Sequence, residues 1–440
     1  MNKLLTTLLL LVLLTLNVSA QHKAMVSTNR LASKPRVLIS TDIGGTDPDD
    51  NQSLAHLLMY SEMFDLEGLV SSPSFGDGNA SEIYRMIDVY EKDLPKLKKH
   101  VKGLMKPKAL CKLVKQGRTD ELPPCGFGEP TEGSEWIVKQ ARKNDPRPLY
   151  VLVWGCLEDV AQALHDAPDI AEKIRVYWIG GPNKKWGVNG YCYIIEHFPN
   201  LWMIENNTTY RAFIYDSKNK DKCNMGFFET FIKDSGHLGR DFAAYYKGNP
   251  KLGDTPSLLY MMKGDPTQPE QQSWGGKFVK CNRTPRTVIK CSMVNGQWSM
   301  KQDTAQVCGI IEWQLQGPVR PDVAIDSACV TLDIRKQQWK GYYKGDGLYV
   351  IRHSTYYTGT LDYIITSTID SFAPINGQIT VENTWDVPGK DTDYIVGSQW
   401  WTDSYAPADY WHNCAGARNQ LVIRDEIMED WGQRWLWLRE

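Results

Sequence analysis

The feature that most constrains the fold is a regular alternation of short apolar runs and helical patterns over residues 35–215. The apolar runs have the length of strands and span residues 36–40, 66–72, 149–154, 175–180 and 201–205. Helical periodicity marks residues 52–64, 81–91, 131–142 and 158–165. Continuous apolar strands alternating with helices are typical of a parallel sheet covered on both faces. The sequence therefore predicts an α/β fold with a mainly parallel sheet and helices on both faces.

The sequence pattern changes near residue 280, where helical periodicity disappears. Short β-rich runs follow at residues 329–334, 347–352, 361–366 and 378–382, separated by turn signals such as Lys344-Gly-Asp-Gly347. Short strands at this spacing favour a β-sandwich module.

The last segment is helical again. From Gly416 onward, large apolar side chains recur at helical spacing: Ile423, Ile427, Trp431, Trp435 and Leu438. A helix with so apolar a face needs a partner surface, so we expect it to pack back on the α/β domain. The predicted organisation is an α/β domain at 34–279, a β-sandwich insertion at 280–395, and a returning segment and helix at 396–440.

The first twenty residues have the pattern of a secretory signal peptide. A positive start at Lys3 precedes an apolar run over 4–16, and small residues follow at Val18-Ser19-Ala20. We therefore expect a secreted or periplasmic protein, and the 10 cysteines of an exported chain leave room for disulfides. No other run has membrane-spanning length, and 50 basic against 52 acidic residues offer no electrostatic footprint for nucleic acid.

Polar, glycine-rich loops follow each predicted strand, at the edge where open parallel sheets bind ligands. The first loop runs from Thr41 to Asp50 and holds four carboxylates, those of Asp42, Asp47, Asp49 and Asp50. The later strand-end loops include Trp154 and three candidate ligands for substrate hydroxyls, Asn79, Asn183 and Asn207. Carboxylates packed together repel one another, and a hard divalent cation with six to eight oxygen ligands relieves this. The alternative is a solvated acidic turn in which Asp49 and Asp50 only favour the start of a helix.

A metal in this loop indicates a hydrolase. A bound divalent ion lowers the pKa of its water, and a carboxylate can then accept the proton as general base. Asp254, in Gly253-Asp-Thr-Pro-Ser257, is a further candidate ligand, although an aspartate before a helix can also be just an N-cap.

Several of these motifs, in this order, resemble the nucleoside hydrolase-like family labelled cellulose-binding. They are Thr41 to Leu54, Phe64 to Pro73, Asp145 to Gly155, Gly253 to Ser257, Ser273 to Gly276, and the stretch from Gly416 to Trp435. The segment from Lys340 to Tyr349 is similar to immunoglobulin-like modules of carbohydrate-active proteins.

The resemblance implies a nucleoside hydrolase-like fold and a calcium ion that activates water to cleave N-ribosyl bonds. By motif, it implies Asp42 and Asp50 as ligands, Asp42 also as base, the carbonyl of Trp154 and the carboxylate of Asp254 as further ligands, and Asn79 as a ligand of sugar hydroxyls.

Two departures from the nucleoside hydrolases shape the functional prediction. Six residues separate Asp42 from Asp49, more than in that family, so Asp47, Asp49 and Asp50 stay alternatives for the same role. Gly253 precedes the distant Asp254 where a leaving-group histidine often stands. We therefore predict an exported calcium-dependent hydrolase of glycosidic or N-glycosidic bonds, acting on a small sugar-containing substrate. The alternative is a non-catalytic protein that binds cellulose or another polysaccharide.

Overall fold

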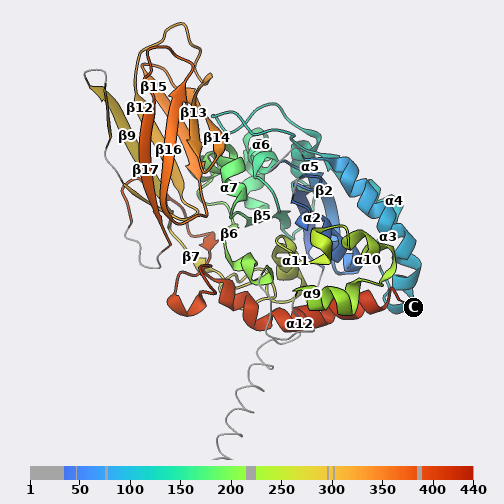
Figure 1. Cartoon of the computed structure of the whole chain (residues 1–440). Helices are drawn as coiled ribbons and strands as arrows, with labels where there is room; N and C mark the ends of the chain where they lie inside the picture. The colour runs from blue at the N-terminus through green and yellow to red at the C-terminus, as the bar shows by residue number, and fades with distance from the viewer. Residues whose placement is uncertain are drawn as a thin grey trace, which may run out of the picture.

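The computed structural model describes residues 34–45, 47–74, 78–214, 224–294, 297–300, 303–383 and 389–439. The predicted signal peptide at 1–20 lies outside these residues. The described chain forms two parts. An α/β part lies at the right of Figure 1, and a β module, residues 286–382, lies at the upper left.

The α/β part is built on an eight-stranded sheet in the order β3-β2-β1-β4-β5-β6-β19-β7. Its strands are β1 (Arg36–Thr41), β2 (Asp65–Ser71), β3 (Val114–Gln116), β4 (Leu149–Val153), β5 (Ile174–Ile179), β6 (Met203–Asn206), β19 (Trp400–Thr402) and β7 (Val279–Lys280). Every neighbouring pair is parallel except β19 with β7. This confirms the predicted mainly parallel sheet.

Helices cover both faces of this sheet, because alternate strand residues point to opposite sides. In β4, Leu149, Val151 and Val153 join one buried core, while Tyr150 and Leu152 join the other. The first core packs against α5 (Glu132–Ala141), α6 (Glu158–Asp166) and α8 (Val188–His197). The second packs against α2 (Asp49–Met59), α3 (Ala80–His100), α9 (Asn224–Phe227), α10 (Gly236–Phe242), α11 (Thr255–Met262) and α12 (Ala417–Leu436). Two short helices, α4 (Pro107–Cys111) and α7 (Asn183–Trp186), complete the set.

The β module is one nine-stranded sheet in the order β10-β9-β12-β15-β14-β13-β16-β17-β11. The strands are β9 (Arg286–Val294), β10 (Gln297–Met300), β11 (Thr304–Gln306), β12 (Ile310–Gln316), β13 (Ala328–Ile334), β14 (Gln337–Tyr343), β15 (Leu348–Ser354), β16 (Gly359–Ser367) and β17 (Ile375–Glu382). Trp313 of β12 and Tyr363 of β16 are four positions apart in this order, yet their rings lie 5.2 Å apart inside one core. The sheet therefore folds over on itself, so that its two halves enclose the core.

The chain leaves and rejoins the α/β part at neighbouring points. The short strands β8 (Arg283–Thr284) and β18 (Tyr394–Ile395) pair with each other, and β19 then lies beside β6 in the main sheet. The final helix α12 runs along the lower edge of Figure 1, where Trp431 and Trp435 are fully buried. The tryptophan-rich face of α12 therefore packs against the α/β part, as its sequence pattern predicts.

A buried ion pair fixes the β module to the main sheet. The ammonium of Lys184 in α7 contacts the Glu205 carboxylate of β6 and donates to the carbonyl of Cys308, 2.7 Å away, in the β module. Glu205 also accepts hydrogen bonds from Tyr191, Asn207 and Trp400. A carboxylate buried in this way is stable only because so many donors surround it.

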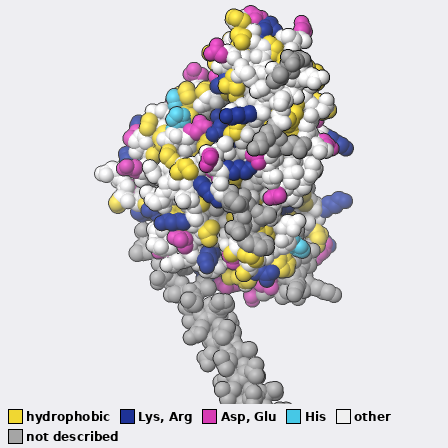
Figure 2. All heavy atoms as spheres, turned by 90° about the vertical axis from the view of Figure 1, so that its left-hand side faces the viewer, with side chains coloured by type: hydrophobic (Ala, Val, Ile, Leu, Met, Phe, Trp, Pro, Cys, Tyr) yellow, Lys and Arg dark blue, Asp and Glu magenta, His cyan; other side chains and the backbone are white. Residues whose placement is uncertain are grey.

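Three further observations bear on the predictions. Eight cysteines in the described part of the chain form none of the disulfides for which the composition leaves room: Cys111, Cys125, Cys156, Cys192, Cys281, Cys291, Cys308 and Cys329. Among the described helices, none combines the length and the apolar composition of a membrane span. On the face shown in Figure 2, basic side chains are mixed with acidic ones, as the near-neutral composition predicts.

Candidate metal centre

The candidate site lies where the strand order of the main sheet reverses. Strand β1 lies between β2 and β4: the chain runs outward from β1 through β2 to β3 and then crosses back to β4, so the strand order reverses between β1 and β4. Loops diverge at such a point and open a crevice outside the carboxyl ends of the strands. A cavity of about 500 Å³ is found here, lined by Asp42, Asp47, Asp49, Asp50, Trp154, Asn183 and Asp254.

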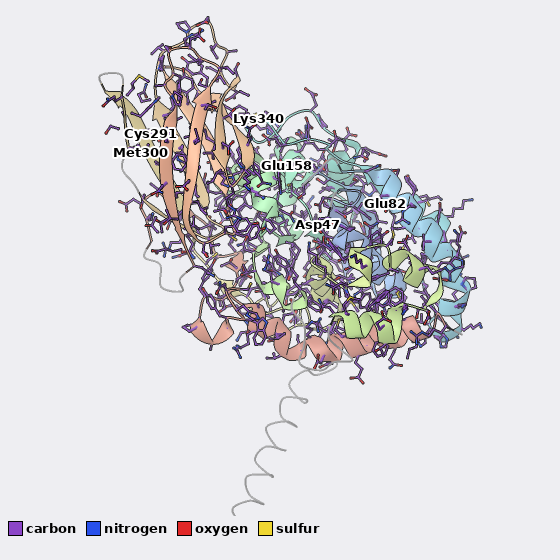
Figure 3. The ribbon with its side chains drawn as sticks, in the orientation of Figure 1. Asp47, Glu82, Glu158, Cys291, Met300 and Lys340 are labelled. Carbon is purple, nitrogen blue, oxygen red and sulfur yellow. The ribbon has the colours of Figure 1, made fainter. Side chains whose placement is uncertain are left out.

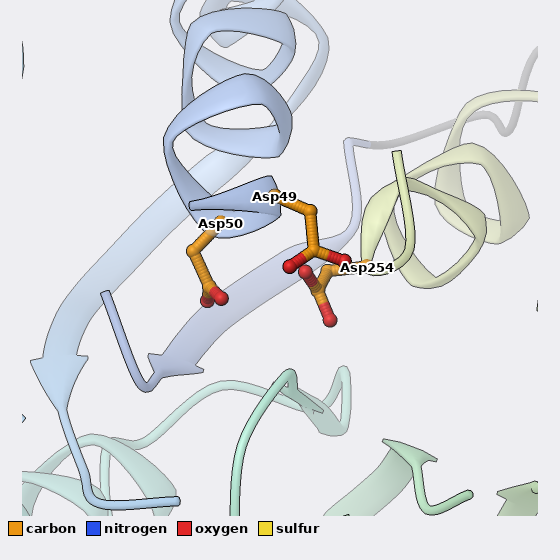
Figure 4. Close-up of side chains that lie close together, drawn as sticks. All are labelled: Asp49, Asp50 and Asp254. Atoms are coloured by element: carbon orange, nitrogen blue, oxygen red, sulfur yellow. The ribbon is translucent and has the colours of Figure 1, made fainter. Parts of the chain in front are cut away.

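Three aspartates from two helix starts converge in this cavity. Asp49 and Asp50 begin α2, and Asp254 stands directly before α11. One carboxylate oxygen of each lies within 4.8 Å of those of the other two, and Figure 4 shows the side chains turned toward one another. All three residues are buried. The start of a helix carries a partial positive charge, which favours carboxylates at these positions.

Asp254 does not act as a helix cap. Its side chain makes no capping hydrogen bond to α11, and its Oδ2 is buried with no hydrogen-bond partner among the described residues. A buried carboxylate oxygen without a partner is costly. The simple N-cap interpretation of Asp254 therefore fails, and its carboxylate is left available to a ligand.

Asp42 joins the cluster from the end of β1. Gly155, which follows Trp154, passes so close that a Cβ at this position would lie 2.8 Å from the Asp42 Cβ. Gly253 is as close to Asp49, with 2.2 Å between its added Cβ and Oδ2. Gly155 is therefore required for the approach of Asp42, and a side chain in place of Gly253 would displace the Asp49 carboxylate. The backbone carbonyl of Trp154 accepts a hydrogen bond of 2.5 Å from the Asn183 amide.

Burial shifts the acidity of the cluster. It raises the pKa of Asp49 to about 7, even though the ammonium of Lys251 lies nearby. It also raises the pKa values of Asp50 and Asp254 well above the ordinary range, and mutual repulsion adds to the rise. Burial raises the pKa of Asp42 too, while hydrogen bonds with Asp50 and Ser74 offset part of that rise. A solvated acidic turn would not show such shifts.

The donor set fits a hard divalent cation. Carboxylate and carbonyl oxygens are the ligands of Ca²⁺ and Mg²⁺, and the larger Ca²⁺ accepts irregular, oxygen-rich shells. Asp42, Asp49, Asp50 and Asp254 supply four carboxylates, and no described cation other than Lys251 reaches them by ion pairing. Bringing such a cation into the cluster would remove the repulsion that raises these pKa values.

Asp47 takes a different place from its neighbours. Its carboxylate pairs with Lys251, and nearly half of the side chain is exposed. Figure 3 labels it at the centre of the α/β part. Asp47 lines the cavity but lies outside the three-aspartate group. Among the three alternatives left by the sequence, the structure therefore favours Asp49 and Asp50 over Asp47 as ligands.

The three asparagines proposed for substrate binding separate in the structure. Asn183 lines the cavity, where its amide holds the ends of β4 and β5 together through the carbonyls of Trp154 and Ile179. Asn79 does not line it, and its side chain caps α3. Asn207 lines another cavity and donates to Glu205. We therefore carry only Asn183 into the proposed site.

Sequence reasoning missed several residues of this cavity. Ser74 follows β2 and accords with the strand-end rule, so its place could have been inferred. Lys251 is an isolated lysine with no local signal. Four residues of the β module also line the cavity: Arg335, Gln337, Tyr356 and Tyr357. Nothing in the sequence indicates that the β module reaches this edge of the sheet.

Comparison with known families agrees with this geometry. The family described as cellulose-binding Sde182, nucleoside hydrolase-like domain matches residues 36–278, more than half of the chain. The chain belongs to this family. No curated protein matches the chain. The predicted resemblance is thereby confirmed, and the matched range holds Asp42, Asp49, Asp50 and Asp254.

Three solved structures match the chain at low sequence identity and with TM-scores below 0.5. A nucleoside hydrolase-related hypothetical protein from Saccharophagus degradans, associated with carbohydrate metabolism, is 18% identical and covers 79% of this chain and 99% of its own, with a TM-score of 0.47. An inosine-uridine preferring nucleoside hydrolase from Bacillus anthracis is 18% identical and covers 57% and 87%, with a TM-score of 0.36. A purine-preferring ribonucleoside hydrolase from Gardnerella vaginalis is 13% identical and covers 56% and 83%, with a TM-score of 0.34.

For this member of the Sde182 family, we expect metal-free protein to lose thermal stability as pH rises from about 5 to 8. The folded pKa values of the cluster lie above the ordinary value, and that of Asp49 is about 7. The stability from such groups is fully present below their unfolded pKa of about 3.9 and is lost as pH rises through the folded pKa. A divalent cation that occupies the cluster should flatten this decline, because carboxylates bind cations in their deprotonated form, and calcium is the cation to be tested.

The measurement is the unfolding temperature at several pH values, in EDTA and in calcium. Burial also raises the pKa of Glu158 to about 8 and that of Asp403 to about 6, and these groups add a decline that calcium does not change. The difference between the two curves is therefore the readout. Parallel curves in EDTA and calcium would contradict the prediction.

Proposed function

We propose that this protein is a calcium-dependent hydrolase of glycosidic or N-glycosidic bonds. The observation that carries the proposal is the convergence of four carboxylates at the carboxyl edge of the sheet, with Oδ2 of Asp254 buried and unpartnered among the described residues. Asp42, Asp49, Asp50, Asp254 and the carbonyl of Trp154 would hold the ion. When bound, a divalent cation acts as a Lewis acid and makes a neighbouring water more acidic.

Asp42 is the proposed general base. It follows β1 directly, and unlike Asp50 and Asp254 it is only half-buried, so one face meets the cavity. Its carboxylate lies beside the side chains of Asp50 and Ser74. A carboxylate held in this way can accept a proton from an attacking water at its free oxygen.

The remaining walls favour a sugar. Trp186, Tyr210 and Tyr356 present aromatic surface to the cavity, and Gln337 presents an amide. Aromatic rings bury the apolar faces of sugar rings, while amides bond their hydroxyl groups. Gly253 supplies no acid to a departing base. We therefore favour a glycan fragment over a nucleoside as the substrate.

A non-catalytic carbohydrate-binding function is the second candidate. The family description as cellulose-binding favours it, as does the aromatic wall of the cavity. In that case, the metal would order the loops around the sugar, and Asp42 would transfer no proton. Export, predicted from the apolar run at residues 4–16, belongs to both proposals. Cell fractionation with N-terminal sequencing of the recovered protein tests it.

The experiment that separates the two functions is sugar release from a panel of oligosaccharides and nucleosides, with calcium or EDTA. Calcium-dependent release from any member supports the hydrolase. A pull-down on insoluble cellulose runs in parallel. Binding to cellulose without release from any member of the panel would overturn the hydrolase in favour of the second candidate.

A further inference from the structure

The cavity has two chemically different walls. The five aspartates that line it all come from the α/β part, beside the carboxyl ends of β1 and β4 and the start of α11. The opposite side, here called the β-module wall, consists of Arg335, Gln337, Tyr356 and Tyr357. No carboxylate of the described residues lines this second wall. A ligand that fills the cavity would therefore contact both parts of the protein.

A strained turn holds Arg335 at this wall. Arg335 and Lys336 form the two-residue turn between β13 and β14, where Ile334 pairs with Gln337. Both have positive φ, 52° and 61°, a conformation that normally selects glycine or asparagine. For other residues this conformation is less favourable than ordinary backbone. A cost of this kind is typical of positions where the side chain has a function.

Aromatic rings further fix the arginine. The guanidinium carbon of Arg335 lies 3.3 Å from the centre of the Tyr357 ring, and the Tyr356 hydroxyl donates to that of Tyr357 over 2.7 Å. Arg335 is exposed, and the described residues provide it with no carboxylate partner. Stacking on an aromatic face fixes the plane of a guanidinium and leaves its N–H edge free to bind an anion.

Two more cations border this wall. Lys185 donates to Gln337 over 3.0 Å and lies 4.6 Å from the centre of the Trp186 ring. The guanidinium carbon of Arg211 lies 5.7 Å from the centre of the Tyr356 ring. Burial lowers the pKa of Lys185 to about 8, and the positive charge of Arg335 contributes. Lys185 and Arg335 therefore repel each other, and an anion bound between them would relieve that repulsion.

We propose that the β-module wall is the specificity subsite of this cavity, and that it takes a sugar bearing an anionic group, a carboxylate or a phosphate. The neutral hydroxyls of the sugar face the aspartate cluster, while the anionic group lies against Arg335 and Lys185. The aspartate wall disfavours that group, because its five carboxylates outnumber the positive charges of one divalent cation and Lys251. This inference deepens the proposed function by naming its substrate class, and it gives the β module a direct part in binding.

The test is calorimetric titration of the full-length, calcium-loaded protein with galactose, galacturonic acid and galactose 6-phosphate. These probes share a ring and differ in charge, and the two anionic probes distinguish a carboxylate from a phosphate ligand. Arg335→Gln removes the cation at the wall. Lys336→Gln is the matched control, because it makes the same change in the same turn, at a residue that does not line the cavity.

We expect one or both anionic sugars to bind at least about tenfold more tightly than galactose, since a hydrogen bond to a charged group contributes about 1.5–3 kcal/mol. Arg335→Gln should remove most of that preference without changing the affinity for galactose, and Lys336→Gln should change neither. Equal binding of the three sugars, no binding of any, or equal effects of both substitutions would overturn the inference.

Calcium titration of the same samples separates this inference from the proposed function. A charge preference that depends on Arg335 in a protein that binds no calcium would support the subsite and reject the metal-dependent hydrolase. Calcium binding and sugar release without any charge preference would reject the subsite alone.

Discussion

Replacing Asp42 with asparagine is expected to lower the rate of sugar release by about 10²- to 10⁴-fold, the contribution typical of a general base. Asparagine keeps the shape of the side chain but cannot accept the proton. The loss should appear in kcat and persist at saturating calcium, because a missing base cannot be replaced by more metal. The measurement is initial rates over a range of calcium and substrate concentrations.

Asp47→Asn is the matched control for this prediction. It makes the same change in the same loop, at a carboxylate that is half exposed and paired with Lys251. We expect this variant to keep most of the activity. Asp254→Asn should instead weaken calcium binding, so that part of its activity returns with excess calcium. Equal rates for Asp42→Asn and Asp47→Asn would show that Asp42 is not the base.

The largest expected effect on stability comes from Lys184→Met, which should lower the free energy of unfolding by about 3–5 kcal/mol. The substitution leaves the Glu205 carboxylate buried without its cation and removes the donor to the Cys308 carbonyl. Both side chains are almost fully buried, so water cannot replace the lost partner. Urea denaturation followed by tryptophan fluorescence measures the change.

Lys263→Met provides the comparison, because Lys263 also pairs with a glutamate, Glu426, but at the surface. Exposed ion pairs contribute about 0–1 kcal/mol, so this variant should be nearly neutral. Adding Glu205→Gln to Lys184→Met should recover part of the loss, since no buried charge then remains. A small effect of Lys184→Met, similar to that of Lys263→Met, would show that the buried pair does not hold the β module in place.

The α/β class followed from the sequence for a local reason. Runs such as 149–154 are apolar at every position, which only a strand covered on both faces requires, and the helices between them exclude a simple antiparallel sheet. The terminal helix was recognisable because Trp431 and Trp435 repeat at helical spacing. The β module was harder to predict. Its strands were visible as short runs, but the single sheet that folds over on itself depends on long-range pairing between distant strands.

The candidate site was predicted in part. The rule that ligands bind at strand carboxyl ends brought Asp42, Asp50, Trp154 and Asn183 together correctly. The same rule also selected Asn79 and Asn207, but the Asn79 side chain caps α3 and the Asn207 side chain donates to Glu205. The rule names the edge of the sheet but not the direction of each side chain. That direction depends on local caps and on neighbours far away in the sequence.

By itself, the sequence determined the sheet, the acidic loop at the end of its first strand and the family, because these rest on local patterns of apolar, acidic and glycine residues. Only the tertiary structure decided which aspartates meet, that Asp254 makes no cap hydrogen bond to its helix, and that Arg335 and Asp42 line the same cavity. Those relations join residues hundreds of positions apart. Such contacts depend on how the β module packs against the main sheet, and no local spacing encodes that packing.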